Sequence, residues 1–426
     1  MSDRRSPDEN WENDYSRRRE QWVHEKFLYG GDLDDFFPET SPSWIECGYK
    51  ISDLKRAFDG AKTMRMALDN LVKLGDHLAD VADNKEDQGM LNSAHEYYHR
   101  ASLCYFRASW GLLNADDPDK QDWHGKGLDV FEKVVELNPT YEMERVEIEL
   151  PFHEETLPAV FHRCGDEPAP TVLHVPGMDM VKEENTNPRN NRLVARGMNV
   201  LTIDGPGQGE ARLRGICADT LERYQKAGSA AIDWLVDRPE VDEDRIGVWG
   251  ISMGSYWAPR IVYEDDRVAA LACYMGSWYS KDMIFEQAQP FFKKRFMYMA
   301  GFEDEAAFDE HVRDMTLHGL EDGINAPTFI AHGEYDELQS REQARRFYEK
   351  LPGPKRLQLY ENEFHGIGRA TVDVRCDIAD WFEQIWQEGI DDDYAEAVLI
   401  PDYPTTSEIP SAGFDFLDTE NYTDSG

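Results

Sequence analysis

The residues best suited to chemistry lie in the pentapeptide Gly250-Ile-Ser-Met-Gly254, which follows the apolar run Arg245 to Val248. A G-x-S-x-G segment placed after a strand predicts a very tight strand-to-helix turn with the serine at its apex. Without β-carbons at Gly250 and Gly254, the strand and the helix can approach closely, so that the Ser252 hydroxyl points into open space. Ser252 is therefore a candidate nucleophile, provided that the chain also supplies a base to activate it.

Two loops farther along the chain carry the partners that such a serine needs. Asp336 follows the apolar run Thr328 to Ala331, and His365 follows the run Arg356 to Tyr360. The order Ser, Asp, His, with each residue in the loop after a strand, is the order of an α/β-hydrolase. We expect His365 to take the proton of Ser252 and Asp336 to hold the imidazole in the correct tautomer.

Each of these partners has an alternative in the same loop. Glu334 could be the acid, but Asp336 lies farther along the loop, where its side chain can reach across. His332 could be the base, but it lies at the strand end beside the acid, where a structural hydrogen bond is the expected role.

Acyl transfer also requires two backbone N–H donors that stabilise the oxyanion. The amide of Met253, directly after the serine, is the first expected donor. The second is expected in the loop after an earlier strand, Val175-Pro-Gly-Met-Asp179, where Met178 is our choice. Gly177 would permit the close approach of the backbone in this loop.

Three segments imitate cofactor or metal sites. His95-Glu-Tyr-Tyr-His99 matches the zinc motif H-E-x-x-H, but it lacks an obvious third ligand, and we interpret it as a packed helix with partly exposed histidines. Gly205-Pro-Gly-Gln-Gly209 has the wrong spacing for a dinucleotide turn. Lys182, Glu183 and Glu184 suggest a cation site, but we interpret them as a solvated helix start. The six cysteines form no C-x-x-C pair. We therefore expect neither a cofactor nor a metal.

The wider pattern predicts an α/β fold of the hydrolase type, with a mostly parallel central sheet flanked by helices. Residues 1–143 are expected to form an N-terminal helical cap domain and residues 144–390 the catalytic domain. Within the latter, residues 277–320 contain no strand pattern and are rich in aromatic residues and methionine, which indicates a helical lid insert. Residues 391–426 are expected to form an acidic tail on the surface.

Composition limits the classes of partner. Asp and Glu total 84 against 45 Lys and Arg, a net charge of −39 spread along the whole chain, so a nucleic-acid partner is not expected. No apolar run approaches the roughly 20 residues that cross a bilayer, and Met1–Asn10 lacks the apolar core of a signal peptide. We therefore expect a cytoplasmic protein without a membrane partner. The dispersed acidic excess suggests an organism that lives in high salt; an ordinary acidic enzyme is the alternative.

Taken together, these residues resemble α/β-hydrolases, and more narrowly the FrsA-like esterases and their carbon–carbon bond and polyketide hydrolase relatives. The resemblance covers roughly residues 50 to 390. Gly250–Gly254 and the loops of Asp336 and His365 carry part of it. The other segments that carry it are Arg100–Ala108, Pro176–Glu184 and Asp204–Glu210. It implies that the helical domain covers the active site and that homodimers occur. It also implies an extra carboxylate in carbon–carbon hydrolases, for which Glu286 is the candidate.

The expected function is that of a serine hydrolase that cleaves a small carboxylic ester through an acyl-enzyme on Ser252. Cleavage of a carbon–carbon bond in a β-diketone-like substrate, by the same three residues, is the first alternative. The second is a non-catalytic binding or regulatory protein on a hydrolase scaffold.

The acidic composition leads to a prediction about salt. We expect the midpoint temperature of thermal unfolding to rise from low to molar salt, because screening reduces the repulsion among the acidic side chains. Calorimetry over a series of salt concentrations measures this directly. A midpoint that does not change with salt would contradict the high-salt interpretation.

Overall fold

The computed structural model describes residues 40–178, 180–185, 187–276 and 281–402 of the chain. Residues 1–39, the first part of the expected cap domain, and residues 403–426, most of the expected tail, lie outside the described residues. Trp278 and Tyr279 at the start of the expected lid insert lie outside them as well.

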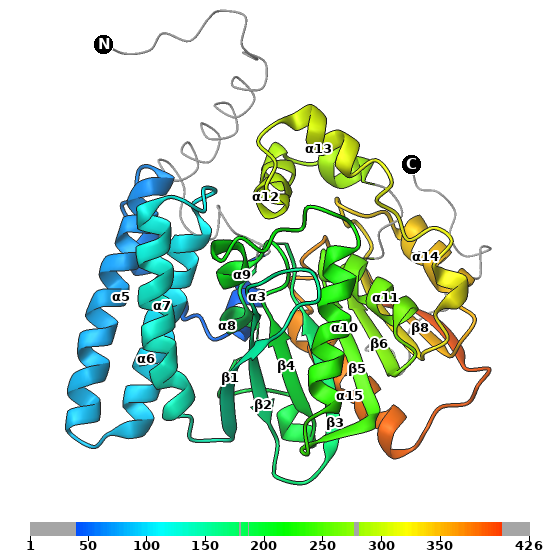
Figure 1. The fold of residues 1–426 in the computed structure, drawn as a ribbon, viewed down its shortest axis with the longest axis horizontal. Coiled ribbons are helices and arrows are strands. Elements are labelled where there is room, and N and C mark those ends of the chain that lie inside the picture. Colours follow the sequence, from blue (N-terminus) through cyan, green and yellow to red (C-terminus); the bar gives the residue numbers. More distant parts are fainter. Residues whose placement is uncertain (1–39, 179, 186, 277–280, 403–426) are drawn as a thin grey trace, which may run out of the picture.

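A mostly parallel sheet forms the centre of the described part of the chain (Figure 1). Its spatial order is β1-β2-β4-β3-β5-β6-β7-β8-β9. β2 runs antiparallel to both of its neighbours, and the pairs from β4 to β9 are all parallel. The strands are β1 Glu142–Ile148, β2 Leu157–Arg163, β3 Ala169–Val175, β4 Asn199–Ile203, β5 Val241–Ile251, β6 Val268–Tyr274, β7 Thr328–Gly333, β8 Lys355–Tyr360 and β9 Ala395–Ile400. The expected fold class is confirmed.

Helices cover both faces of this sheet, which explains why its central strands are apolar on both sides. On one face lie α10 (Arg223–Val236), α11 (Gly254–Glu264) and α14 (Arg341–Lys350), whose apolar side chains share a core with β3, β5 and β6. On the other face α15 (Thr371–Gln387) packs against Val172, Trp249 and Phe329. Because the strands from β4 to β9 are parallel, their carboxyl ends lie at one common edge of the sheet.

A helical unit stands beside the β1 edge of the sheet (Figure 1). Its long helices are α5 (Met64–Asp87), α6 (Leu91–Trp110) and α7 (Pro118–Glu136), preceded by the short helices α3 (Thr40–Glu46) and α4 (Ile51–Phe58). Thr63 caps α5 through the amide of Met66, and Asp117 caps α7 through the amide of Asp119. None of the described helices is long and apolar enough to cross a membrane.

Further short helices lie in the connections between the strands. They are α8 (Lys182–Asn185), η1 (Val194–Arg196), α9 (Gly209–Leu213), the π-helical turn η2 (Met283–Gln287), α12 (Pro290–Ala300), α13 (Glu305–His311) and η3 (Glu321–Gly323). Within the residues expected to form a lid insert, η2, α12 and α13 are the helical segments, and turns join them. Phe285, Phe296 and Phe308 of this insert pack on one another and are buried, and they belong to the same core as the side chains of the sheet and of α11.

The expected tail contains a strand that the sequence analysis missed. Residues 395–400 form β9, which pairs in parallel with β8 and extends the sheet at its edge. The segment Ala-Glu-Ala-Val-Leu-Ile is short and lies in an acidic surrounding, so its pattern is weak. Its stability as a strand comes from the hydrogen bonds that β8 offers, which local sequence does not reveal.

Candidate active site

Ser252 lies at a strained turn between β5 and α11. Its backbone has φ 54°, a left-handed conformation that a residue other than glycine rarely adopts. A β-carbon at Gly250 would lie 2.3 Å from the carbonyl oxygen of Gly254, and one at Gly254 would lie 2.2 Å from that of Val175. The two glycines are therefore required by close backbone contacts, for the reason expected from the pentapeptide.

The structure brings together the three residues expected to act on a substrate. The Ser252 hydroxyl lies 2.8 Å from Nε2 of His365, and Nδ1 of His365 lies 2.9 Å from Oδ2 of Asp336. They come from the loops after β5, β8 and β7, whose carboxyl ends meet at the common edge of the sheet. This arrangement can transfer a proton from the hydroxyl to the imidazole.

The acid of this group is held as a carboxylate. Burial raises the pKa of Asp336, but the imidazoles of His365 and His332 and the amide of Leu338 together outweigh it, so that the pKa is lowered. The amides of Leu338 and Gln339 also donate to its Oδ1, at 2.9 and 3.0 Å. Because an ionised Asp336 can only accept, Nδ1 of His365 carries its proton, and Nε2 is left to accept from Ser252.

Neither alternative partner replaces Asp336 or His365: Glu334 is bound elsewhere, and Nδ1 of His332 lies 3.9 Å from Oδ2 of Asp336. Glu334 accepts from the guanidinium of Arg341 at 3.3 Å and from the amide of Asn362 at 3.0 Å. His332 is fully buried, and its Nε2 lies 3.1 Å from the carbonyl oxygen of Gln339. Burial lowers the pKa of His332, so its ring is neutral. Its contacts are those of a structural histidine.

The loop after β3 lies directly against the serine. A β-carbon at Gly177 would be only 3.3 Å from Cβ of Ser252. The side-chain amide of Gln208 donates to the carbonyl oxygen of Gly177 at 2.5 Å and to that of Pro176 at 3.4 Å. The side-chain oxygen of Gln208, Oε1, accepts from the backbone amide of Gly205 and from the Tyr224 hydroxyl. Gln208 therefore fixes the orientation of the peptide that joins Gly177 to Met178.

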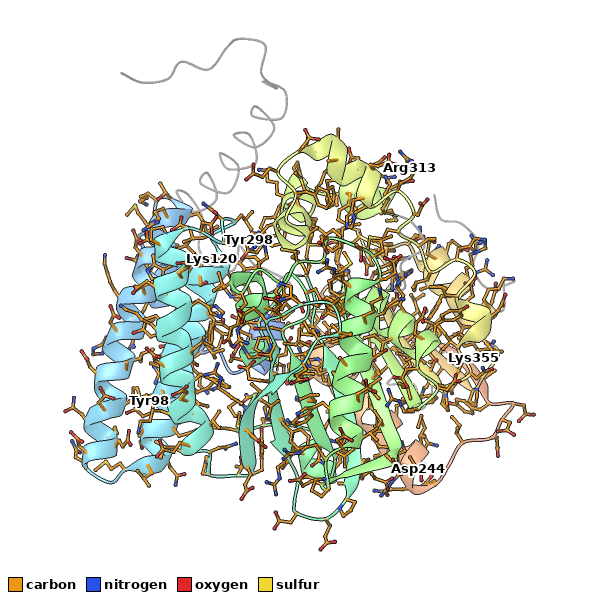
Figure 2. All side chains as sticks on the ribbon, in the orientation of Figure 1. Tyr98, Lys120, Asp244, Tyr298, Arg313 and Lys355 are labelled. Atoms are coloured by element: carbon orange, nitrogen blue, oxygen red, sulfur yellow. The ribbon has the colours of Figure 1, made fainter. Side chains whose placement is uncertain are left out.

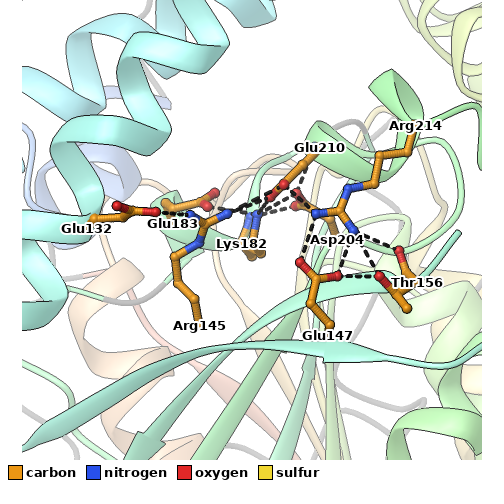
Figure 3. A network of polar contacts seen from close by, with 9 residues as sticks. All are labelled: Glu132, Arg145, Glu147, Thr156, Lys182, Glu183, Asp204, Glu210 and Arg214. Carbon is orange, nitrogen blue, oxygen red and sulfur yellow. Dashed lines mark hydrogen bonds and ion pairs between the residues drawn. The ribbon is translucent and has the colours of Figure 1, made fainter.

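The run Lys182-Glu183-Glu184, expected to be solvated, is buried, so that expectation is wrong. Figure 3 shows the Lys182 ammonium among carboxylates, at 3.1 Å from Asp204, 2.9 Å from Glu210 and 2.8 Å from Glu183. The Lys182 amide also donates to Asp204 at 2.7 Å. This ion cluster fastens the loop after β3 to the loop after β4. An isolated sequence run cannot reveal it, because Asp204 and Glu210 lie more than 20 residues away.

The ion cluster continues to the cap helices. Arg145 of β1 binds Glu210 at 3.1 Å and Glu132 of α7 at 3.0 Å, and Arg214 binds the other oxygen of Glu210 at 2.6 Å (Figure 3). Burial raises the pKa of Glu210, but Lys182 and the two arginines outweigh it and lower the pKa to about 2.

Glu183 differs from Glu210 in its titration. Burial raises the pKa of Glu183 from 4.5 to about 7, and the neighbouring Lys182 opposes this shift without cancelling it. Its carboxylate has no hydrogen-bond partner among the described residues besides the ion pair with Lys182. Glu183 is thus the member of the ion cluster that accepts a proton most readily.

The segment Asp204-Gly-Pro-Gly-Gln-Gly-Glu210 supplies residues that the sequence analysis did not assign to the site. Asp204, Gln208 and Glu210 bind the loop beside Ser252, through Lys182 and the Gly177 carbonyl. The signal was present as a glycine-rich loop with three polar side chains directly after a buried strand.

The H-E-x-x-H histidines are buried, not partly exposed as expected. His95 and His99 are 0% and 4% exposed, and burial lowers their pKa values to about 4 and about 3. The Glu96 carboxylate instead forms an ion pair with the guanidinium of Arg189, at 3.0 Å. Among the described residues no group of three His, Cys, Asp or Glu side chains is arranged to hold a metal ion.

Glu286 lies away from the hydrogen-bonded group. Its carboxylate is more than half exposed and binds the ammonium of Lys281 at 2.5 Å. No contact of the described residues joins it to Ser252, Asp336 or His365.

The insert and the cap helices meet beside the site. Arg295 of α12 donates to the carbonyl oxygen of Trp110 at the end of α6, at 2.6 Å, and stacks 3.7 Å above its ring. Figure 2 shows Lys120 and Tyr298 at the same boundary, where the ammonium lies 4.9 Å from the ring centre. The amide of Ala218 donates to the carbonyl oxygen of Met299 at 3.0 Å, which places α12 on the segment that follows β4.

Comparison with known proteins agrees with this geometry. The sequence model of the family described as Esterase FrsA-like matches residues 78–302, which is more than half of the chain. The chain belongs to the FrsA-like esterase family. Esterase FrsA from Escherichia fergusonii is 30% identical over 178 residues, which span 42% of this chain and 41% of that protein. The expected family and the expectation of an α/β-hydrolase enzyme are confirmed.

Another relative matches over most of its length. The 2,6-dihydropseudooxynicotine hydrolase of Paenarthrobacter nicotinovorans is 28% identical over 350 residues, which span 80% of this chain and 90% of that protein. A crystal structure of the 2,6-dihydroxy-pseudo-oxynicotine hydrolase superposes with a TM-score of 0.73 at 25% identity, over 83% of this chain and 98% of that one. The cap helices and the catalytic sheet thus recur together in a known hydrolase.

The close contacts at the turn predict the effect of adding one carbon atom. We expect Gly254→Ala to lower the free energy of unfolding by at least about 3 kcal/mol, because the added methyl group meets backbone rather than a movable side chain. Gly125→Ala is the control, since nothing lies within 4 Å of its added carbon. In a helix that change should stabilise by about 0.5–1 kcal/mol. Equal stabilities of the two variants in urea unfolding would contradict the tight turn.

The buried Glu183 predicts a pH dependence of stability. Between pH 4.5 and about 7 the folded chain keeps the Glu183 proton that the unfolded chain has lost, so its contribution to stability falls as the pH rises through this window. We expect Glu183→Gln to show a flatter stability profile between pH 5 and 7 than the wild type. Glu154→Gln, at an exposed position, is the control and should keep the wild-type slope. An unchanged slope in Glu183→Gln would show that Glu183 does not titrate there.

Proposed function

We propose that this protein is a serine hydrolase that cleaves a small carboxylic ester through an acyl-enzyme on Ser252. The observation that carries the proposal is the hydrogen-bonded chain from Ser252 through His365 to Asp336 at a strained strand-to-helix turn. Membership in the FrsA-like esterase family supports it. The proposed substrate is a small molecule, and the proposed reaction involves neither a metal nor a cofactor.

The proposed reaction has two halves. In the first, the Ser252 oxygen attacks the ester carbonyl while Nε2 of His365 takes its proton, and the imidazolium then protonates the leaving alcohol. In the second, His365 takes a proton from water, whose oxygen attacks the acyl group, and the imidazolium then returns a proton to the Ser252 oxygen as the acid is released. The Asp336 carboxylate stabilises the imidazolium in both halves, because it binds Nδ1 throughout.

Two backbone amides are proposed to bind the oxyanion that forms in each half. The Met253 amide follows the serine directly. The Met178 amide belongs to the same peptide group as the Gly177 carbonyl, which Gln208 binds. In a trans peptide these two groups point in opposite directions, so the Met178 N–H points away from Gln208. The closeness of Gly177 to Ser252 supports this choice of donor.

Cleavage of a carbon–carbon bond beside a ketone is the second candidate. The long match to a relative named for an oxynicotine substrate favours it, since that protein shares both the cap helices and the sheet. The position of Glu286, exposed and paired with Lys281, does not favour it, because this carboxylate was expected to assist that reaction. Turnover of β-diketones without turnover of esters would select this candidate.

A binding or regulatory protein without catalysis is the third candidate. Such a protein would not need three side chains aligned for proton transfer, and so the geometry favours an enzyme. The cytoplasmic location, the high-salt environment and the homodimer stay predictions.

The proposed nucleophile gives a direct test. We expect the wild type to hydrolyse p-nitrophenyl acetate or butyrate and to be labelled by a fluorophosphonate, and Ser252→Ala to lose both, with a rate at least about 10³-fold lower. Ser93→Ala, which removes an exposed hydroxyl on α6, should leave both unchanged. Absence of labelling in the folded wild type, at high salt as well as low salt, would overturn the proposal of an enzyme.

A further inference from the structure

A small polar cavity lies on the face of the sheet that α15 covers, away from Ser252. Its volume is about 30 Å³, and its walls include His174 of β3, Trp249 of β5, Asn191, Arg192 and Arg375. About 10–15 Å³ suffices for one water molecule, so the cavity admits a particle of that size or slightly larger. Nothing in the proposed reaction uses this cavity.

Arg375 of α15 brings a positive charge into the cavity. Its side chain is buried, with 6% of the residue exposed. Its Nη2 donates to the Ser43 hydroxyl at 3.4 Å and lies 3.9 Å from Sγ of Cys47. Within the described residues it forms no ion pair with a carboxylate, and its Nε has no hydrogen-bond partner. A buried arginine without a counter-charge is costly, so an anion beside it would be stabilising.

The other ionisable groups on the cavity wall leave that charge uncompensated. Arg192 is paired with Glu46 of α3 at 2.6 Å, and this pair is neutral as a whole. Burial and, to a smaller extent, the charge of Arg375 lower the pKa of His174 to about 3, so the imidazole is neutral. Burial also raises the pKa of the neighbouring Cys47 thiol, which is therefore uncharged. The cavity thus carries the single positive charge of Arg375.

Several buried hydrogen-bond donors on the cavity wall have no partner among the described residues. They are Nε1 of Trp249, Nδ2 of Asn191 and Nε of Arg375, together with whichever nitrogen of the neutral His174 ring carries the proton. The rings of His174 and Trp249 lie side by side, with centroids 4.8 Å apart. The acceptors there without a hydrogen bond are Oδ1 of Asn185, the unprotonated nitrogen of His174 and Oε2 of Glu46, and the last of these forms the ion pair with Arg192. The excess of donors is the pattern that an anion satisfies and that one water molecule does not.

We propose that this cavity binds a small monovalent anion of halide size, held by Arg375, Asn191 and Trp249. One negative charge balances Arg375, and a space of about 30 Å³ suits a small anion. The bound anion joins α3, the segment before η1, β3, β5 and α15, since each of these contributes to the cavity wall. It therefore stabilises the attachment of α3 to the back of the catalytic sheet. This site is independent of the proposed ester hydrolysis.

The test compares chloride with gluconate, which is too large for the cavity, at constant ionic strength. The expected result is a midpoint temperature of unfolding that rises with chloride concentration in place of gluconate and follows a single-site binding curve. Crystals grown in bromide should show anomalous scattering in the cavity between Arg375 and Asn191. Equal midpoints in both salts together with no bromide peak would mean that the cavity holds water only, and would overturn the proposal.

Two variants separate this site from general salt effects. Asn191→Asp places a carboxylate where the unpaired Nδ2 lies and keeps Oδ1, which accepts from the amides of Leu193 and Val194. It should remove the chloride dependence while keeping the stability, because the new charge replaces the anion. Arg375→Gln should also remove the chloride dependence, with a loss of stability. Arg345→Gln, on the exposed side of α14, is the control and should keep the wild-type response. A wild-type chloride response in Asn191→Asp would overturn the proposal.

Discussion

The buried charge of Lys182 is the interaction on which the surroundings of the site depend. A lysine that is 1% exposed is stable only with carboxylates around it, and these come from the loop after β4. Through Glu210 and Arg145 the same ion cluster reaches α7 of the cap. One desolvated ammonium thus holds together the loop beside Ser252, the loop after β4 and the helical domain. Hydrophobic packing alone would not fix the orientation of the two loops relative to the helical domain so closely.

The sheet supplies the second condition for function. Parallel strands place their carboxyl ends at one edge, so residues separated by 29 to 113 positions can meet there. The turn at Ser252 adds strain, and the two glycines make that strain possible by removing β-carbons from backbone contacts. Gln208 then orients the adjacent peptide through its carbonyl oxygen. The chemistry proposed for Ser252 follows from these backbone constraints as much as from the identity of the three side chains.

The outcome of the sequence predictions depended on whether the relevant interaction was local. The strands that precede Ser252, Asp336 and His365 were apparent from their apolar runs, and so the meeting of the three side chains could be predicted from chain order. From local sequence the lysine–glutamate run is expected to be a solvated helix start, with its anions near the helix N-terminus. Its burial depends on Asp204 and Glu210, and that of the H-E-x-x-H histidines depends on packing between helices. β9 forms only because β8 offers an open edge.

The sequence by itself determined the α/β-hydrolase fold class, the helical character of residues 51–136, and the chain order of the three residues proposed as nucleophile, acid and base. These follow from periodicity, glycine positions and chain order, which are properties of short segments. The tertiary structure alone decided which polar groups are buried together. These are the groups of the Lys182 ion cluster, the Gln208 amide with the Gly177 carbonyl, and the groups around the cavity of Arg375. The physical reason is that the energy of a buried charge is set by partners distant in sequence, and only the folded chain brings those partners within a few ångströms.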